Sequence, residues 1–236
     1  MTIINHIRKY TNSIIDLFYP KVCVTCDALL LPDEALICHH CQSDLPLTYF
    51  HLDNQNQLYD RLSAIVKIEA ATSLLLFDKS SIVKELIHQL KYQNRQEIGN
   101  FLGKLLAKHI QNDPVVSQID YIIPVPLHAK KQKKRGYNQM TIFGKTLQNE
   151  LKIEYNAQIL LKTVNNQSQT TKTAAQRRKN VAGVYQVQNP EKYQNKHFLI
   201  IDDVMTTGAT IEACAESILQ QIEGAKVSVL TMAVVL

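Results

Sequence analysis

The spacing of apolar and polar residues predicts a chain of alternating strands and helices that settles in after about residue 63. Short apolar runs bounded by polar residues predict strands, the first two of which form a possible hairpin, at 64–70, 73–77, 120–125, 156–164, 198–201 and 226–235. Apolar positions that recur every three or four residues predict helices at 80–110, with a break near 91–96, at 136–151 and at 209–222. This alternation is typical of a mostly parallel α/β sheet, whose ligands bind beyond the carboxyl ends of the strands.

The residues before this pattern have a different character. Helical spacing of apolar positions over the first 18 residues predicts an amphipathic helix, and its polar face, poor in lysine and arginine, favours packing on protein over membrane docking. Arg8, Lys9 and Asp16 interrupt any signal-peptide core. Residues 42–62 are polar and rich in turn-forming residues, which is typical of a linker. We therefore expect an N-terminal segment at 1–55 and a larger domain at 56–236.

Composition narrows the class of protein. The chain has 236 residues, of which 45% are hydrophobic and 20% charged, and this balance is typical of a soluble globular protein. The formal net charge of +5 is small, so any argument for a charged partner must come from local clusters. No apolar run approaches the roughly 20 residues of a membrane-spanning helix, so we expect no transmembrane segment and a cytoplasmic location.

Four of the five cysteines predict a metal site. Cys23 and Cys26 form one CxxC pair, and Cys38 and Cys41 form a second pair after eleven residues. Two such pairs supply four thiolates for a tetrahedral Zn²⁺ site, and a reducing cytosol favours metal over disulfides. A closed site of this kind is structural. A redox CxxC motif and a His ligand in place of one thiolate remain alternatives, and Cys214 is expected in the core.

The stretch "FLIIDDVMTTGATIEACAES" carries the strongest chemical signal. Asp202 and Asp203 follow a buried strand, and two carboxylates at a strand end require hydroxyl donors, a metal ion, or both. The loop after them enters a helix, and its backbone N–H groups and threonine hydroxyls form a cradle of phosphate size. Vicinal hydroxyls and a phosphate together describe a ribose 5-phosphate compound. The residues predicted to bind it are Asp202, Asp203, Val204, Met205, Thr206, Thr207, Gly208, Ala209 and Thr210.

This stretch resembles the phosphoribosyl pyrophosphate (PRPP) motif of type I phosphoribosyltransferases, in which the acids hold the ribose hydroxyls and the loop holds the 5-phosphate. Taken with the two CxxC pairs, "PVPLHAKKQKKRGYNQ" and "QTTKTAAQRRKNVAGVY", the chain is similar to the ComF family of competence proteins. The resemblance implies a type I phosphoribosyltransferase fold with a hood, preceded by a small zinc-finger segment with four cysteine ligands. It also implies Mg²⁺ bound with PRPP and a role in DNA uptake during natural transformation.

Two further loops are expected at the same end of the sheet. The resemblance makes the first a pyrophosphate loop, with Val125, Pro126, Leu127, His128, Lys131 and Arg135 as its candidate residues. Its basic cluster also suggests contact with single-stranded DNA, for which the candidates are Lys130, Lys131, Lys133, Lys134, Arg135 and Tyr137. The resemblance makes the second the hood loop that closes over substrate, with Arg177 and Asn180 matching the family pattern. A solvated charge run is the alternative for the first loop, and plain flexibility for the second.

Three functions fit these features. The first is a phosphoribosyltransferase whose acceptor the sequence does not identify, and Pro124 and Pro126 lack N–H donors that such a loop would use. The second is a binding module for PRPP, a nucleotide or single-stranded DNA. The third is an adaptor whose zinc segment binds a partner such as a competence helicase.

Overall fold

The computed structural model describes residues 20–78, 82–127, 138–163 and 184–236. The chain divides into two compact units, Met1–Leu45 and Pro46–Leu236. The helix predicted over the first 18 residues lies outside the described residues. Within them, no helix is both long enough and apolar enough to cross a membrane.

The first unit is a set of turns with little regular structure. Val22 and Leu29 form an isolated antiparallel bridge around a tight turn, in which Asp27 adopts a positive φ of 58°. The short helix α2 (His39–Ser43) follows, with Cys38 as its N-cap. A segment this short cannot bury enough apolar surface to fold alone, so it needs a metal or another staple.

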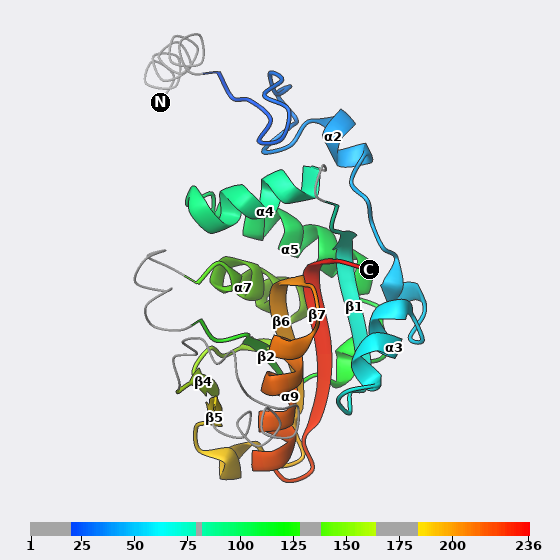
Figure 1. The fold of residues 1–236 in the computed structure, drawn as a ribbon. Coiled ribbons are helices and arrows are strands. Elements are labelled where there is room, and N and C mark those ends of the chain that lie inside the picture. The colour runs from blue at the N-terminus through cyan, green and yellow to red at the C-terminus, as the bar shows by residue number, and fades with distance from the viewer. Residues whose placement is uncertain (1–19, 79–81, 128–137, 164–183) are drawn as a thin grey trace, which may run out of the picture. The chain divides into compact units, whose positions relative to one another are not determined.

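A five-stranded parallel sheet forms the centre of the second unit (Figure 1). Its strand order is β1-β7-β6-β2-β3, and every pairing is parallel. The strands are β1 (Ala70–Leu76), β2 (Tyr121–Pro124), β3 (Glu154–Tyr155), β6 (His197–Met205) and β7 (Lys226–Val234). The two longest strands, β6 and β7, lie side by side in the middle. All five strands therefore end at one edge of the sheet, as the sequence predicts for a ligand site.

Helices cover both faces of this sheet. Among its described residues, the second unit has the α-helices α3 (Gln57–Ser63), α4 (Ile82–Tyr92), α5 (Glu97–Ile110), α7 (Met140–Leu151) and α9 (Ala209–Gln221). The 3₁₀ turns η1 (Phe50–Leu52), η2 (Val116–Gln118) and η3 (Pro190–Tyr193) accompany them. Helix α9 packs on β6, β7 and the hairpin strand β5 (Tyr185–Val187), whereas α7 packs on β2, β3 and β6 and also against α5. The predicted α/β class with helices flanking a parallel sheet is confirmed.

The core follows from the alternation of side chains along β6. Phe198 and Ile200 are fully buried in the cluster that includes Ile211 and Cys214 of α9. Ile201, one residue on, faces α7, because its Cδ1 lies 2.9 Å from the position a Cβ would take on Gly144. Each such buried side chain contributes roughly 1.5–3 kcal/mol of hydrophobic free energy. The prediction that Cys214 belongs to the core is confirmed, since it is fully buried.

Three local predictions were wrong. A single strand, β1, replaces the expected hairpin over 64–77, and it runs parallel to β7. Helix α3 lies in the segment predicted as a linker, where Asn56 caps it by accepting the N–H groups of Leu58 and Tyr59. Strand β6 continues through the acids to Met205, because Asp202, Val204 and Met205 stay in register with β7.

A small antiparallel hairpin of β4 (Leu160–Lys162) and β5 lies apart from the main sheet. Only β4 of this pair is anticipated by the apolar run at 156–164. The side chain of Gln221 in α9 ties the hairpin to the domain, because it accepts the N–H of Val187 and donates to the carbonyl of Tyr185.

Candidate functional site

A cavity lies at the carboxyl end of β6, where the chain turns into α9. It has a volume of about 220 Å³ and opens to solvent. Gly208 is the N-cap of α9 and has a φ of +83°, a left-handed conformation that favours glycine. The residues that line the cavity are Asp202, Val204, Met205, Thr206, Thr207, Gly208, Ala209, Thr210 and Ile211. These are the residues predicted for the ribose phosphate, with Ile211 added and Asp203 left out.

The N-terminal end of α9 suits an anion. Gly208 has no side chain to cap the helix, and Thr207 Oγ1 accepts only a long 3.5 Å contact from the N–H of Ala209. The first N–H groups of any helix have no partner within the helix, and the helix dipole makes this end positive. Thr206, Thr207 and Thr210 are exposed and add hydroxyl donors. The loop at 206–208, which we call the phosphate loop, can therefore hold a phosphate group together with the start of α9.

The two acids do not point the same way. Because β6 continues through them, Asp202 faces the α9 side of the sheet and Asp203 faces the opposite side. The strand extends beyond the end at residue 201 that the sequence predicts, so the two side chains lie on opposite faces of the sheet. Asp202 Oδ1 accepts the N–H of Asp203 at 2.8 Å and lines the cavity. Asp202 is thus the acid available to a ligand there.

Asp203 is held by two side chains from other elements. Lys91 Nζ, at the end of α4, lies 2.7 Å from Asp203 Oδ1, and Gln139 Nε2, just before α7, donates to Asp203 Oδ2 at 2.5 Å. Asp203 is only 6% exposed, so this pairing offsets the cost of burying a carboxylate. The contacts fix α4 and the start of α7 against β6.

Asp202 is an unusual carboxylic acid. Its burial and the neighbouring Asp203 carboxylate raise its pKa from an ordinary value of 3.8 to about 7, against the opposing pull of Lys91. Burial disfavours the charged form, and a like charge nearby adds to that effect. Around neutral pH, Asp202 can therefore either accept or donate a hydrogen bond to a sugar hydroxyl.

Arg61 of α3 braces the loop from behind. Its guanidinium donates to the carbonyl of Thr206 and to that of Val235, both at 2.5 Å. The N–H of Val235 in turn bonds to the carbonyl of Met205 at 2.9 Å. One arginine therefore joins α3, the phosphate loop and the last residues of the second unit.

The loop after β2 starts beside this cavity. β2 pairs with β6, and the N–H of Val125 bonds to the carbonyl of Ile201 at 2.9 Å. Val125, Pro126 and Leu127 therefore leave the sheet at the same edge as Asp202. The other candidates in this loop lie outside the described residues: His128, Lys130, Lys131, Lys133, Lys134, Arg135 and Tyr137.

The β4–β5 hairpin lies next to Asp202. Lys162 Nζ lies 5.3 Å from the ring centroid of Tyr185 and 3.4 Å from its hydroxyl. Burial raises the pKa of the Tyr185 phenol, and the Cys214 thiol and the Asp202 carboxylate raise it further, so the phenol stays protonated. The predicted hood residues Arg177 and Asn180 fall between the two strands, outside the described residues.

The four N-terminal cysteines come together in the first unit. Their sulfur atoms all lie within 4.8 Å of one another, and Cys26 Sγ and Cys38 Sγ are 3.7 Å apart. A tetrahedral site with Zn–S bonds of about 2.3 Å needs sulfur atoms roughly 3.8 Å apart, so these cysteines fit such an ion. Backbone N–H groups of Cys38 and Cys41 point at Cys23 Sγ and Cys38 Sγ, at 3.3 and 3.4 Å, and stabilise thiolate charge. The cysteine cluster can therefore hold a metal ion, as predicted.

Sequence reasoning missed three supporting residues: Lys91, Gln139 and Arg61. A buried carboxylate needs a cation or donor partner, and this signal pointed to their existence but not to their positions. Lys91 and Gln139 are more than 60 residues from Asp203 along the chain, so only the packing of α4 and α7 identifies them.

The geometry above can now be compared with known proteins. Residues 141–235, which run from the first turn of α7 to the end of the sheet, match the family model described as "Phosphoribosyl transferase domain". This part of the chain is therefore similar to a phosphoribosyl transferase domain. The match includes β6, the phosphate loop and α9, so the predicted fold class is confirmed for this part of the chain.

Curated relatives extend the similarity beyond the phosphoribosyl transferase domain. The chain is 29% identical over 207 residues to "DNA utilization protein YhgH" of Escherichia coli O157:H7, covering 84% of each chain. It is 27% identical to "Competence protein F" of Haemophilus influenzae, covering 74% of each chain. It is 24% identical to "Competence protein ComFC" of Bacillus subtilis, covering 89% of this chain and 94% of the relative. The resemblance to the ComF family is confirmed.

Proposed function

We propose that the protein binds PRPP, or another ribose 5-phosphate compound, in the cavity at the end of β6, and that it acts in the uptake and use of DNA. The observation that carries the first part is the juxtaposition of an acid, Asp202, with an exposed, donor-rich helix start at Thr206–Thr210. The second part follows from the printed names of the relatives, which are competence and DNA utilization proteins.

Each half of the cavity takes one part of the ligand. The N–H groups of Ala209 and Thr210 and the threonine hydroxyls hold the 5-phosphate. The Asp202 carboxylate accepts hydrogen bonds from the ribose hydroxyls. Mg²⁺, bound with PRPP, supplies positive charge at the diphosphate. Val125 to Leu127 leave the sheet on the side where that diphosphate lies when the ribose sits over β6.

Pentosyl transfer is the reaction that this arrangement supports. Pyrophosphate leaves C1 of the ribose as a nucleophile attacks, with positive charge building on the sugar ring. Such a step needs no covalent enzyme intermediate, only positioning and charge stabilisation. Asp202 contributes by fixing the ribose, and Asp203 with Lys91 contributes by fixing the strand that carries Asp202.

Calorimetry tests the binding proposal. PRPP with Mg²⁺ should bind the full chain, and Asp202→Asn should lower the affinity about tenfold or more, because a charged acceptor for the ribose is lost. Asp60→Asn, an exposed acid of α3, is the matched control and should bind as the parent does. A parent chain that gives no heat with PRPP or ribose 5-phosphate would overturn the proposal.

Turnover is tested separately by pyrophosphate release. The parent protein with PRPP and a panel of acceptor bases should release pyrophosphate, whereas Asp202→Asn should release it at least about a hundredfold more slowly. PRPP binding without release from any acceptor would retain the binding proposal and reject transfer.

We propose that the four clustered cysteines of the first unit hold a structural Zn²⁺ ion. Four thiolates leave no open coordination position, so the ion takes no part in chemistry. Free thiolates persist in a reducing compartment, which supports the proposed cytoplasmic location.

A role in DNA uptake makes two further partners testable, single-stranded DNA and a competence helicase. The basic cluster Lys130–Arg135 is the candidate DNA contact, and phosphate contacts make such binding fall steeply with salt. DNA binding that survives Asp202→Asn and is lost when the cluster is neutralised supports direct contact. Helicase binding that is lost on Cys23→Ser alone supports an adaptor function. A transformation assay with these variants then shows which activity the cell needs.

A further inference from the structure

A second cavity lies at the opposite, amino end of the sheet. It is lined by residues from the starts of β1, β6 and β7, from the end of α5 and from the turns around η1 and η2. Its volume is about 360 Å³, including open solvent. We call it the amino-end pocket. Leu199, near the start of β6, belongs to it, whereas Asp202 of the same strand belongs to the carboxyl-end cavity, so the two sites are distinct.

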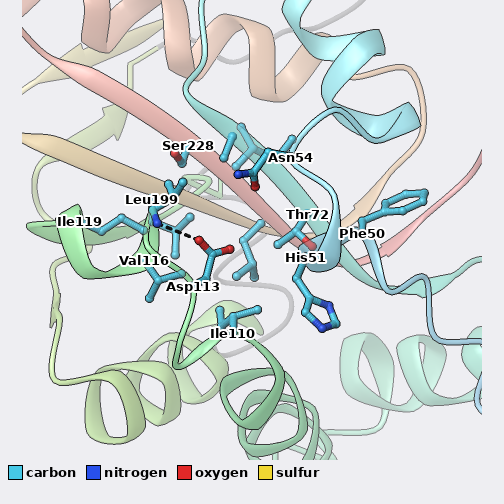
Figure 2. A pocket seen from close by; sticks show the side chains of 15 residues that line it. Phe50, His51, Asn54, Thr72, Ile110, Asp113, Val116, Ile119, Leu199 and Ser228 are labelled. Atoms are coloured by element: carbon cyan, nitrogen blue, oxygen red, sulfur yellow. Dashed lines mark hydrogen bonds between the residues drawn. The ribbon is translucent and has the colours of Figure 1, made fainter.

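The residues that line the amino-end pocket are mostly apolar, with a few polar groups among them (Figure 2). Figure 2 shows the side chains of Ile110 and Leu199 beside those of Asn54, Thr72 and Asp113. One oxygen of Asp113 accepts the N–H of Val115 at 2.7 Å, which orients the carboxylate. Its second oxygen can accept from a ligand.

Thr72 is the most telling of these groups. Its Oγ1 is buried, and within the part of the chain that the structure describes it has no hydrogen-bond partner. A buried hydroxyl without a partner loses the hydrogen bonds that it makes in water, so a ligand that supplies a partner is favoured here. Ser228, by contrast, is already hydrogen-bonded to His197 Nε2 at 2.9 Å.

The charge of the amino-end pocket limits what it can bind. Its described lining residues include a carboxylate, Asp113, and no lysine or arginine. Phosphates and carboxylates are therefore disfavoured, and neutral or cationic groups with N–H donors are favoured. A nucleotide does not suit this site, but an uncharged base does.

Two aromatic side chains belong to the lining of the amino-end pocket. They are Phe50 and His51, and the centroid of the His51 ring lies 5.1 Å from that of His109. Burial, and then the neighbouring His109, lower the pKa of His51 against the opposing effect of Asp113, which favours the neutral ring. A neutral ring stacks on a flat heterocycle without adding charge.

We infer that the amino-end pocket binds a planar heterocycle with an exocyclic amine, such as cytosine or adenine. The amine donates to the free oxygen of Asp113, the Thr72 hydroxyl pairs with a ring acceptor, and the ring face packs on Ile110 and Leu199. This inference does not rest on PRPP binding at the other end of the sheet.

Calorimetry on the full chain tests this inference by comparing free bases that differ in the exocyclic amine. Cytosine and uracil have the same shape, but uracil has a carbonyl where cytosine has its amine, and hypoxanthine differs from adenine in the same way. Cytosine or adenine should bind about tenfold or more tightly than its amine-free counterpart, since a bond to a charged acceptor is lost. Equal affinity within both pairs, or no binding by any of the four bases, would overturn the inference.

Two variants locate the binding. Asp113→Asn keeps an oxygen for the Val115 N–H and removes the charge, so it should lower the affinity for the amine-bearing base about tenfold and abolish the preference. Asp53→Asn, an exposed acid beside Asn54, is the control. Asp202→Asn should leave base binding unchanged and weaken only PRPP binding. Base binding lost with Asp202→Asn and kept with Asp113→Asn would assign it to the carboxyl-end cavity and overturn the inference.

Discussion

At the scale of single residues, the two adjacent acids do different work because a strand turns successive side chains to opposite faces. Asp203 is an internal anchor, paired with Lys91 and Gln139. Asp202 lines the cavity and has a raised pKa. One dipeptide thus supplies both the acid that lines the cavity and the support for it.

Removing the cation of the buried pair should destabilise the domain. Lys91→Met leaves the Asp203 carboxylate buried with only Gln139 as a partner, and we expect a loss of about 3 kcal/mol in the free energy of unfolding. Lys84→Met, at an exposed position of the same helix, should change it by less than about 0.5 kcal/mol. Urea denaturation measures both. Similar values for the two variants would contradict the importance assigned to the pair.

Asp202 should make stability depend on pH. An acid whose pKa is higher in the folded chain binds its proton more tightly when folded. The contribution of Asp202 to the free energy of unfolding is therefore largest below the ordinary pKa of 3.8, and it is lost as the pH rises toward and through about 7. Asp202→Asn removes this contribution. Thermal melts at about pH 5 and about pH 8 should show a smaller loss for the variant than for the parent, and an equal or larger loss would argue against the raised pKa.

At the scale of elements, α7 is held close to the sheet by a glycine. A Cβ on Gly144 would lie 2.3 Å from the Tyr155 ring and 2.9 Å from Ile201 Cδ1, so the helix can approach this closely only without a side chain there. That approach places Gln139, just before α7, against Asp203. The contact between helix and sheet therefore supports the site.

Gly144→Ala should push α7 outward. We expect a loss of about 1–3 kcal/mol in stability from overpacking, and a weaker affinity for PRPP as Gln139 moves from Asp203. Gly99→Ala in α5 is the matched control, because its nearest contact would be an ordinary 3.4 Å and alanine favours a helix. Chemical denaturation and calorimetry of the two variants test this. Equal stabilities would show that α7 has room to spare.

Arg61 ties a different element to the phosphate loop. Arg61→Met keeps the aliphatic stem but loses the bonds to the carbonyls of Thr206 and Val235, so the loop should become less ordered. PRPP affinity should fall about three- to tenfold in calorimetry. Amide exchange at residues 206–208 should rise, while exchange in α5 should stay at the parent level. An unchanged affinity would show that the loop is rigid without α3.

The hydrophobic pattern predicted long helices and strands better than short segments whose structure depends on distant parts of the chain. Strand β7 and helices α5 and α9 have long apolar periods, and the structure contains them close to the predicted positions, whereas β6 begins as predicted and runs on through the acids. The motif of acids and threonines predicted the carboxyl-end cavity because the residues that line this cavity are adjacent in the sequence. The prediction of a hairpin at 64–77 was wrong because β1 pairs with β7, which comes from the far end of the chain. The amino-end pocket had no local signal, because Asp113, Thr72 and Leu199 meet only in the folded sheet.

At the scale of the whole molecule, two units with separate means of stabilisation should respond separately to loss of metal. The first unit depends on its four thiolates, whereas the second has its own apolar core. Purified protein should contain one Zn²⁺ per chain, and Cys38→Ser should contain far less. A strong chelator should make residues 20–45 sensitive to protease and leave PRPP binding within about twofold of the parent value. Loss of PRPP binding on chelation would show that the second unit depends on the first.

The edges of the five-stranded sheet influence whether the protein aggregates at high concentration. On the outer side of β1, the N–H of Thr48 bonds to the carbonyl of Leu74, and the N–H of Leu76 bonds to the carbonyl of Pro46, so the chain's own residues occupy that edge. On the other side the sheet ends in β3, which is two residues long. In the described part of the chain, the five-stranded sheet therefore offers few unpaired backbone groups with which a strand of a neighbouring copy could pair. Fibre growth by edge-to-edge pairing has no template at this sheet. The protein should stay in solution at concentrations where a protein with a sheet of this size and long exposed edge strands would aggregate.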